Sequence, residues 1–209
     1  MMANTKKKRR SRSIMSRSDI PFAKRLQMQQ RHDIVANRGY AAKISLYCTS
    51  VALHEIEGVG YKRLIRFSFR YRELEDEFYE DPEVGMAHAK QRMAQLGMPI
   101  SGEFFTMPDE GQTRRQYEVD THALQACQVS QIVAAIAMND EFGYGLERQT
   151  RIRNRTAELA ARYREEGSGF LLEAMAKIGF VIKDGIAMMY MDEDGVAVRP
   201  TKKEKEVYT

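Results

Sequence analysis

The segment EIEGVGYKRLIRFSFRYREL (residues 55–74) recurs in altered form as DEFGYGLERQTRIRNRTAEL (residues 140–159) in this 209-residue chain. Aligned without a gap, residues 52–74 and residues 137–159 are identical at eight of 23 positions. The identical residues are Ala52, Gly58, Gly60, Arg63, Arg66, Arg70, Glu73 and Leu74, each with a counterpart 85 positions later. This similarity indicates an internal duplication, so we expect two related structural units.

Apolar residues at helical spacing flank both glycine pairs, which predicts a helix on either side of each pair. Before the pairs, the apolar faces are Ile44, Tyr47, Cys48, Val51 and Ala52, and then Leu124, Cys127, Val129, Ile132, Ile136 and Met138. After the pairs, they are Leu64, Phe67, Tyr71, Leu74 and Phe78, and then Leu146, Ile152, Leu159 and Tyr163. A glycine turn of this kind would join two antiparallel helices.

A short third helix is expected to close each unit, over residues 86–96 and 169–178. Gly97 and Gly179 follow these segments and are typical C-terminal stops. Near the start of the chain, Asp19 before Pro21 indicates the beginning of the first helix, and Gly39 is the first helix breaker after it. Each unit is therefore predicted to be helix, tight turn, helix and short helix.

Composition divides the chain into six parts. We expect a disordered basic tail, a first helical unit, a linker with two Pro and two Gly, a second helical unit, a small β element and a polar tail. Their predicted bounds are 1–18, 19–98, 99–119, 120–180, 181–200 and 201–209. In the fifth part, turn formers separate three short apolar stretches, which predicts a β-hairpin or a three-stranded meander. The predicted fold class is mainly α with this small β element.

The charge of the chain is unevenly distributed. Residues 1–17 hold seven basic side chains and no acid, whereas the rest holds 26 basic and 29 acidic side chains, a net charge of −3. The basic residues of the tail are Lys6, Lys7, Lys8, Arg9, Arg10, Arg12 and Arg17. Such runs bind polyanions with release of counterions, so we expect nucleic acid, with DNA as the first choice, as the partner of the tail. The alternative is a solubilising tail without a partner.

The sequence offers little to a catalytic or metal site. Its four histidines, His32, His54, His88 and His122, are far apart, and no HExxH, CxxC, P-loop or GxSxG motif occurs. The acidic run at residues 192–195 is a better hairpin turn than a cation loop, because an EF-hand needs more ligands over twelve residues. Cys48 and Cys127 are expected to be reduced core residues. We expect no enzyme activity, no cofactor and no metal.

The chain also lacks the features of a membrane or secreted protein. No apolar run approaches the roughly 20 residues that span a bilayer. The positive N-terminus is not followed by the apolar region of a signal peptide. These features predict a protein of the cytoplasm, without a membrane partner.

Arginines at i, i+3 and i+7 form a matching basic stripe on the second helix of each unit. The stripes consist of Lys62, Arg63, Arg66 and Arg70 in the first unit, and of Arg148, Arg151 and Arg155 in the second. Two interpretations are open. In one, the stripes and the backbone N–H groups at Gly58, Gly60, Gly143 and Gly145 bind phosphates. In the other, the arginines are neutralised by nearby acids, namely Glu55, Glu57, Glu73, Asp140, Glu141 and Glu158.

The first glycine turn resembles the hairpin of helix-hairpin-helix DNA-binding motifs, through Leu53, Ile56, Gly58-Val59-Gly60, Arg63 and Leu64. In that family the hairpin amides bind DNA phosphates without reading the sequence. The signature E-F-G-x-G-x-x-R at residues 141–148 is also similar to that of small helical proteins of phages and mobile elements of Gram-positive bacteria. That resemblance implies a bacterial host cell and either a DNA-associated accessory role or inhibition of a host defence system, as in anti-CRISPR proteins.

These observations favour a non-enzymatic protein that works by binding. The first hypothesis is nucleic-acid binding through the tail and the arginine stripes. The second is a protein-binding inhibitor of a nucleic-acid-handling host enzyme, with residues 99–120 or an acidic face as its contact surface. The sequence leaves open whether the two units pack on each other or on a second chain in a homodimer.

Overall fold

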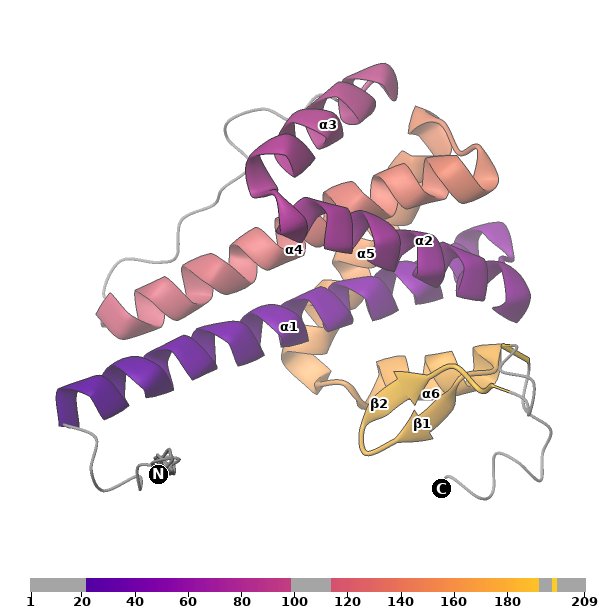
Figure 1. Cartoon of the computed structure of the whole chain (residues 1–209). Coiled ribbons are helices and arrows are strands. Elements are labelled where there is room, and N and C mark those ends of the chain that lie inside the picture. Colours follow the sequence, from indigo (N-terminus) through magenta and orange to yellow (C-terminus); the bar gives the residue numbers. More distant parts are fainter. Residues whose placement is uncertain (1–21, 99–113, 192–196, 199–209) are drawn as a thin grey trace, which may run out of the picture.

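A computed structural model describes residues 22–98, 114–191 and 197–198, which form six helices and one β-hairpin (Figure 1). In chain order the elements are α1 (Phe22–Glu57), α2 (Tyr61–Glu80), α3 (Pro82–Gln95), α4 (Arg114–Phe142), α5 (Leu146–Glu166), α6 (Gly169–Ile178), β1 (Val181–Lys183) and β2 (Ile186–Met188). The predicted class, mainly α with a small C-terminal β element, is confirmed.

Three helix boundaries differ from the prediction. α1 continues through Gly39, since an interior glycine costs only about 1 kcal/mol relative to alanine and the helix is 36 residues long. α4 begins at Arg114, within the segment predicted to be linker. α3 begins at Pro82 because the side chain of Asp81 caps it, accepting a hydrogen bond from the Val84 N–H at 3.2 Å.

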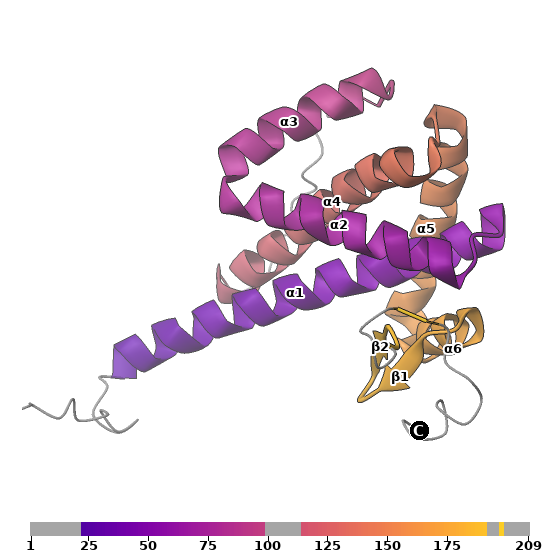
Figure 2. The same cartoon turned by 45° about the vertical axis from the view of Figure 1, so that its right-hand side comes forward.

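The two units are crossed. α1 and α4 lie against each other as inner helices, α2 packs on α4, and α5 packs on α1 (Figures 1 and 2). At one of these contacts the Phe67 ring of α2 stacks on the Phe142 ring of α4, with centroids 6.1 Å apart. The expected antiparallel packing of consecutive helices is therefore wrong. Each glycine turn instead directs the second helix onto the inner helix of the other unit.

A single hydrophobic core joins the two units. The predicted apolar face of α2 is buried throughout, from Leu64 to Phe78. The corresponding face of α5 is only partly buried: Ile152 and Leu159 belong to the core, whereas Leu146 is 48% exposed, contrary to prediction. Leu146 occupies the position of Tyr61, which is buried in the first unit, so the two copies differ in burial at the start of this helix.

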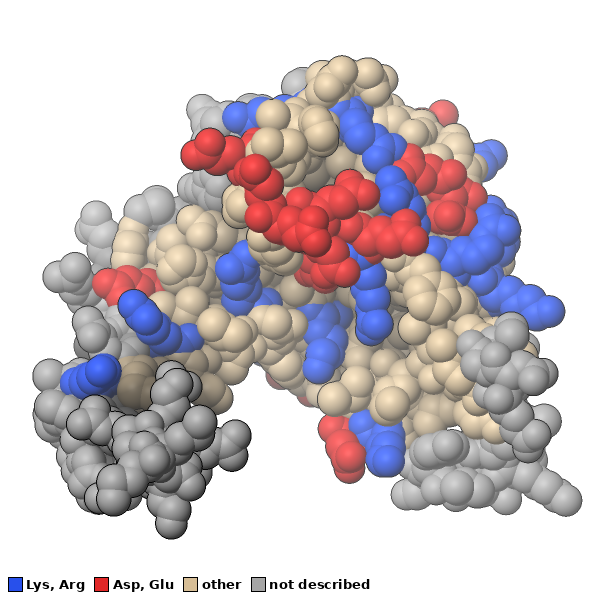
Figure 3. Space-filling view, in the orientation of Figure 1, with Lys and Arg blue, Asp and Glu red and all other residues tan. Residues whose placement is uncertain are grey.

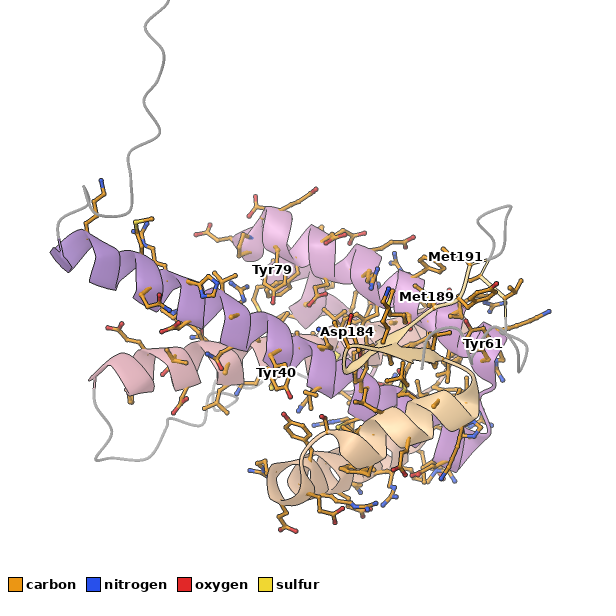
Figure 4. All side chains as sticks on the ribbon, turned by 90° about the horizontal axis from the view of Figure 1, so that it is seen from below. Tyr40, Tyr61, Tyr79, Asp184, Met189 and Met191 are labelled. Carbon is orange, nitrogen blue, oxygen red and sulfur yellow. The ribbon has the colours of Figure 1, made fainter. Side chains whose placement is uncertain are left out.

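The β-hairpin is fastened to α1 and α2. Its register pairs Val181 with Met188, and its turn, Asp184-Gly185, has positive φ at both residues, as a type I′ turn requires. Ala187 N–H donates a hydrogen bond to the hydroxyl of Tyr47 on α1 at 2.8 Å. Figure 4 shows Met189 and Met191, which follow β2, near Tyr61 of α2. The hydroxyl of Tyr61 accepts a 3.2 Å hydrogen bond from the N–H group of Tyr190. The turn predicted at residues 192–195 lies outside the described residues.

Candidate nucleic-acid interface

The first glycine of each pair is required by the backbone. Gly58 and Gly143 have φ values of 62° and 66°, in the left-handed region that side chains disfavour. The Gly58 N–H donates to the carbonyl of His54 at 3.0 Å, and the Gly143 N–H donates to that of Asn139 at 2.8 Å. These bonds end α1 and α4, so the N–H groups of Gly58 and Gly143 are already occupied.

His54 and Asn139 perform the same task in the two turns. The Nδ1 atom of His54 lies 3.0 Å from the carbonyl oxygen of Val59, and Asn139 Nδ2 lies 3.5 Å from that of Tyr144. A carbonyl oxygen only accepts, so Nδ1 of His54 carries the proton. The histidine therefore stabilises the turn, and an amide replaces it in the second unit.

The second glycine of each pair leaves a helix N-terminus without a side-chain cap. Gly60 and Gly145 precede α2 and α5 with φ of −81° and −84°, and neither provides a side-chain hydrogen bond. The first-turn N–H groups of a helix carry a partial positive charge and bind anions when no side chain caps them. Both turns lie at the same end of the molecule in Figures 1 and 2.

Cationic side chains stand beside these uncapped ends. Lys62 and Arg63 are exposed in the first turn of α2, and Arg148 is exposed in that of α5. The Arg63 guanidinium lies 4.7 Å from the centre of the Phe142 ring, and that of Arg148 lies 5.2 Å from the centre of the Tyr144 ring. The start of α2 thus combines backbone donors with two cations, whereas the first turn of α5 holds Glu147 beside Arg148.

Farther along the stripes, Arg70 and Arg155 hold the two units together. Arg70 Nε lies 2.8 Å from a carboxylate oxygen of Asp140, and Arg155 Nε lies 2.7 Å from one of Glu55. Each arginine also pairs with an acid three residues later on its own helix, at 2.9 and 2.8 Å. The pairs occupy matching positions in the two copies, so the duplication also preserves this contact.

These contacts change the proton affinity of the groups involved. Burial raises the pKa of Asp140, but hydrogen bonds from Arg92 and Arg70 outweigh it and hold the pKa below its ordinary value. Hydrogen bonds to Glu55 and Glu158 raise the pKa of Arg155. Asp140 therefore loses its charge at a lower pH than an ordinary aspartate does.

Arg66 and Arg151 cross between the units as well, but remain more exposed. Arg66 Nε is 2.9 Å from a carboxylate oxygen of Glu141, and an Nη atom of Arg151 is 2.8 Å from one of Glu57. The two arginine side chains are 64% and 54% exposed, against 27% for Arg70. All six acids named as neutralising partners in the sequence are thus in contact with the stripes.

The surface of the first unit changes sign along α2. Seven acids follow the basic start of the helix within residues 73–83, namely Glu73, Glu75, Asp76, Glu77, Glu80, Asp81 and Glu83. Figure 3 shows acidic side chains gathered over the C-terminal half of α2, with basic side chains toward its N-terminal end. We call residues 73–83 the acidic patch. It is a second charged surface, distinct from the helix ends.

The remaining predicted features are the basic tail, the metal and membrane predictions and the two cysteines. The basic residues Lys6, Lys7, Lys8, Arg9, Arg10 and Arg12 lie outside the described residues. Within the described ranges, no three His, Cys, Asp or Glu side chains are placed to hold a metal ion. None of the helices there is long and apolar enough to cross a membrane. Cys48 and Cys127 are both free thiols.

Comparisons of the chain with family models, with curated proteins and with solved structures found no match.

Proposed function

We propose that this protein is a non-enzymatic nucleic-acid-binding protein that contacts phosphates with the N-terminal ends of α2 and α5 and with its basic tail. The observation that carries the proposal is the pair of uncapped helix ends at Gly60 and Gly145, each next to exposed cations. Two such helix ends at one end of a molecule suit a repeated polyanion better than a single small anion, and the first, with Lys62 where the second has Glu147, is the more basic of the two.

The arginine stripes contribute unequally to the proposed surface. Arg66 and Arg151 are more than half exposed, so a phosphate can approach them without breaking the fold. Arg70 and Arg155 are less exposed, and each already bonds two carboxylates. We therefore assign Arg70 and Arg155 to joining the units and the remaining stripe residues to phosphate contact.

The wider role follows from the resemblance of residues 141–148 to proteins of phages and mobile elements. Under this proposal the protein is a DNA-associated accessory protein that acts in the cytoplasm of a bacterial host. Phosphate contacts carry no sequence information, so we expect binding without sequence preference.

Replacing Gly60 and Gly145, the N-cap residues of α2 and α5, by Asp tests the proposal. An Asp N-cap would accept hydrogen bonds from the first-turn N–H groups and place a negative charge where the phosphate is expected. No atom lies within 4 Å of a Cβ built on either glycine, so the side chain fits. We expect the Gly60→Asp, Gly145→Asp double variant to bind a fluorescent DNA duplex roughly tenfold more weakly, measured by anisotropy, at equal or higher stability.

The matched control replaces the same two glycines by Asn, which caps the helices without a charge. We expect it to bind DNA better than the Asp variant. If the Asp variant binds DNA as tightly as the wild type does at all salt concentrations, the helix ends are not the contact.

The acidic patch favours a second candidate function. Residues 73–83 offer a dense array of carboxylates that is complementary to the basic surface of an enzyme that binds nucleic acid. The candidate is a protein-binding inhibitor of a host defence nuclease. The variant Asp76→Asn, Glu80→Gln, Glu83→Gln changes exposed acids and should abolish inhibition of such an enzyme while leaving DNA binding intact.

A further inference from the structure

A cavity of about 610 Å³ lies between α1, α4 and α5, away from the glycine turns. Its wall includes Ile44 and Cys48 of α1, Cys127 and Met138 of α4, and Ala157 and Ala160 of α5. Sites for small molecules are mostly apolar hollows of about 300–1,000 Å³, so the volume and the lining fit such a site.

Four residues of α5 that line the cavity are smaller than their counterparts in the first copy. Where α2 carries Phe67, Tyr71, Arg72 and Glu75, α5 carries the smaller residues Ile152, Thr156, Ala157 and Ala160. In the first unit, the Phe67 and Tyr71 side chains are buried in the core. In the second unit, the four smaller residues all line the cavity, and Thr156 stands where the first unit has the buried Tyr71.

The cavity is elongated and has unlike ends. On α1 its lining extends from Asn37 to Thr49, a length of about 18 Å along the helix axis. At one end the hydroxyl of Tyr163 donates a 2.7 Å hydrogen bond to that of Tyr40 (Figure 4 labels Tyr40), and Arg164, the residue after Tyr163, also lines the cavity. Most of the lining is apolar, and further polar side chains, among them Thr150, Arg153 and Asn154, come from the N-terminal half of α5.

The charge of the lining is entirely positive. Arg153 and Arg164 are its only Lys, Arg, Asp or Glu side chains among the described residues. Neither arginine forms an ion pair with a carboxylate in the described part of the chain. This contrasts with the stripe arginines Arg66, Arg70, Arg151 and Arg155, which are paired. An anion is thus the charge that the cavity lacks.

We propose that this cavity binds a long-chain carboxylate, with its hydrocarbon chain against the apolar lining and its carboxylate at Arg164 and the hydroxyls of Tyr40 and Tyr163. An extended hydrocarbon chain fits the elongated cavity, and the carboxylate that it carries would meet Arg164, one of the two arginines of the lining.

The first test titrates the full chain with dodecanoate and measures the heat of binding by calorimetry. We expect saturable one-to-one binding, and no binding of dodecyltrimethylammonium, which has the same chain and the opposite charge. Arg164→Gln should weaken dodecanoate binding about tenfold, because it removes a charge-assisted hydrogen bond. Arg162→Gln is the matched control: Arg162 is also on α5, but it pairs with Glu166 and does not line the cavity.

The second test fills the cavity with the residue of the first copy. Thr156→Tyr reproduces Tyr71 at the equivalent position and should abolish dodecanoate binding while the melting temperature is held or raised. Should this variant fail to fold, alkylation of the wild type decides. Dodecanoate should slow the reaction of Cys127 with iodoacetamide, because Cys127 lines the cavity and is partly exposed.

Three results would overturn the proposal. The first is equal binding of dodecanoate and dodecyltrimethylammonium. The second is full affinity in a folded Thr156→Tyr variant. The third is a wild-type protein that is a dimer and does not bind dodecanoate, together with a Thr156→Tyr variant that is a monomer. A second copy of the chain would then be the occupant of the cavity.

Discussion

The glycines of each pair have different physical roles, although the sequence presents them alike. Gly58 and Gly143 have positive φ, whereas Gly60 and Gly145 have extended backbone that any residue adopts. The sequence correctly predicts that a turn between two helices needs a glycine, but the pattern Gly-x-Gly does not say which one. The second glycine matters for what it lacks, a side chain that would cap the helix.

A pair of substitutions distinguishes these roles. Gly58→Val should destabilise the protein by about 1–3 kcal/mol, because valine is strained at positive φ. Gly60→Ser should be neutral or stabilising by a few tenths of a kcal/mol, since serine caps the helix. Urea unfolding measures both. Equal losses of stability in the two variants would contradict the assignment.

Asp140 should make the stability of the folded protein depend on pH in the acid range. Its pKa is lowered in the folded protein, so its contribution is fully present above the pKa of the unfolded chain, about 3.9. The contribution is lost as the pH falls through the folded pKa. We therefore expect Asp140→Asn to destabilise at pH 7 and to reduce the fall in stability below pH 4. Thermal melts of both proteins from pH 7 to pH 2 provide the measurement.

At the scale of the helices, the stripe arginines form a less exposed pair, Arg70 and Arg155, and a more exposed pair, Arg66 and Arg151. Arg70→Gln with Arg155→Gln should destabilise more than Arg66→Gln with Arg151→Gln, because Arg70 and Arg155 each bond two carboxylates. An exposed ion pair contributes about 0.2–1 kcal/mol, so the Arg66 and Arg151 variant should lose roughly 0.4–2 kcal/mol at most.

The same variants test which of these arginines contact phosphates on the proposed DNA surface. The Arg66 and Arg151 double variant should lower the slope of log affinity against log salt by about two, one for each lost phosphate contact. The Arg70 and Arg155 double variant should lower stability and leave that slope unchanged. An unchanged slope in both would assign all four arginines to structure alone.

Much of each helix could be predicted from the sequence, but not how the helices meet. The apolar spacing of α2 identifies a face that is buried from Leu64 to Phe78. The acids that neutralise the stripes could also be named, because they flank the glycine turns. The repeat shows which residues are equivalent but not which helices are neighbours, so the crossing of α2 onto α4 was missed. The cavity was missed for a related reason: small residues such as Thr156 and Ala160 gain meaning only from what surrounds them.

At the scale of the whole molecule, the tail and the body should be separable. Deleting residues 1–17 removes seven positive charges and none of the core residues. We expect an unchanged melting temperature and a smaller salt dependence of DNA binding, because fewer counterions are released. Wild-type affinity and salt slope after the deletion would exclude the tail as a contact.

Crossed helices also have a consequence for synthesis on the ribosome. The buried face of α2 is complete at residue 80, but the helix that covers it ends at residue 142. At about 5–20 residues per second, the ribosome needs roughly 3–12 s to make the 62 residues between them. During that time Leu64, Phe67 and Tyr71 lack α4, the helix on which α2 packs, so we expect the nascent first half to be a substrate for chaperones. A messenger truncated between α3 and α4 should yield an aggregating fragment, and co-expression of the missing half should rescue it.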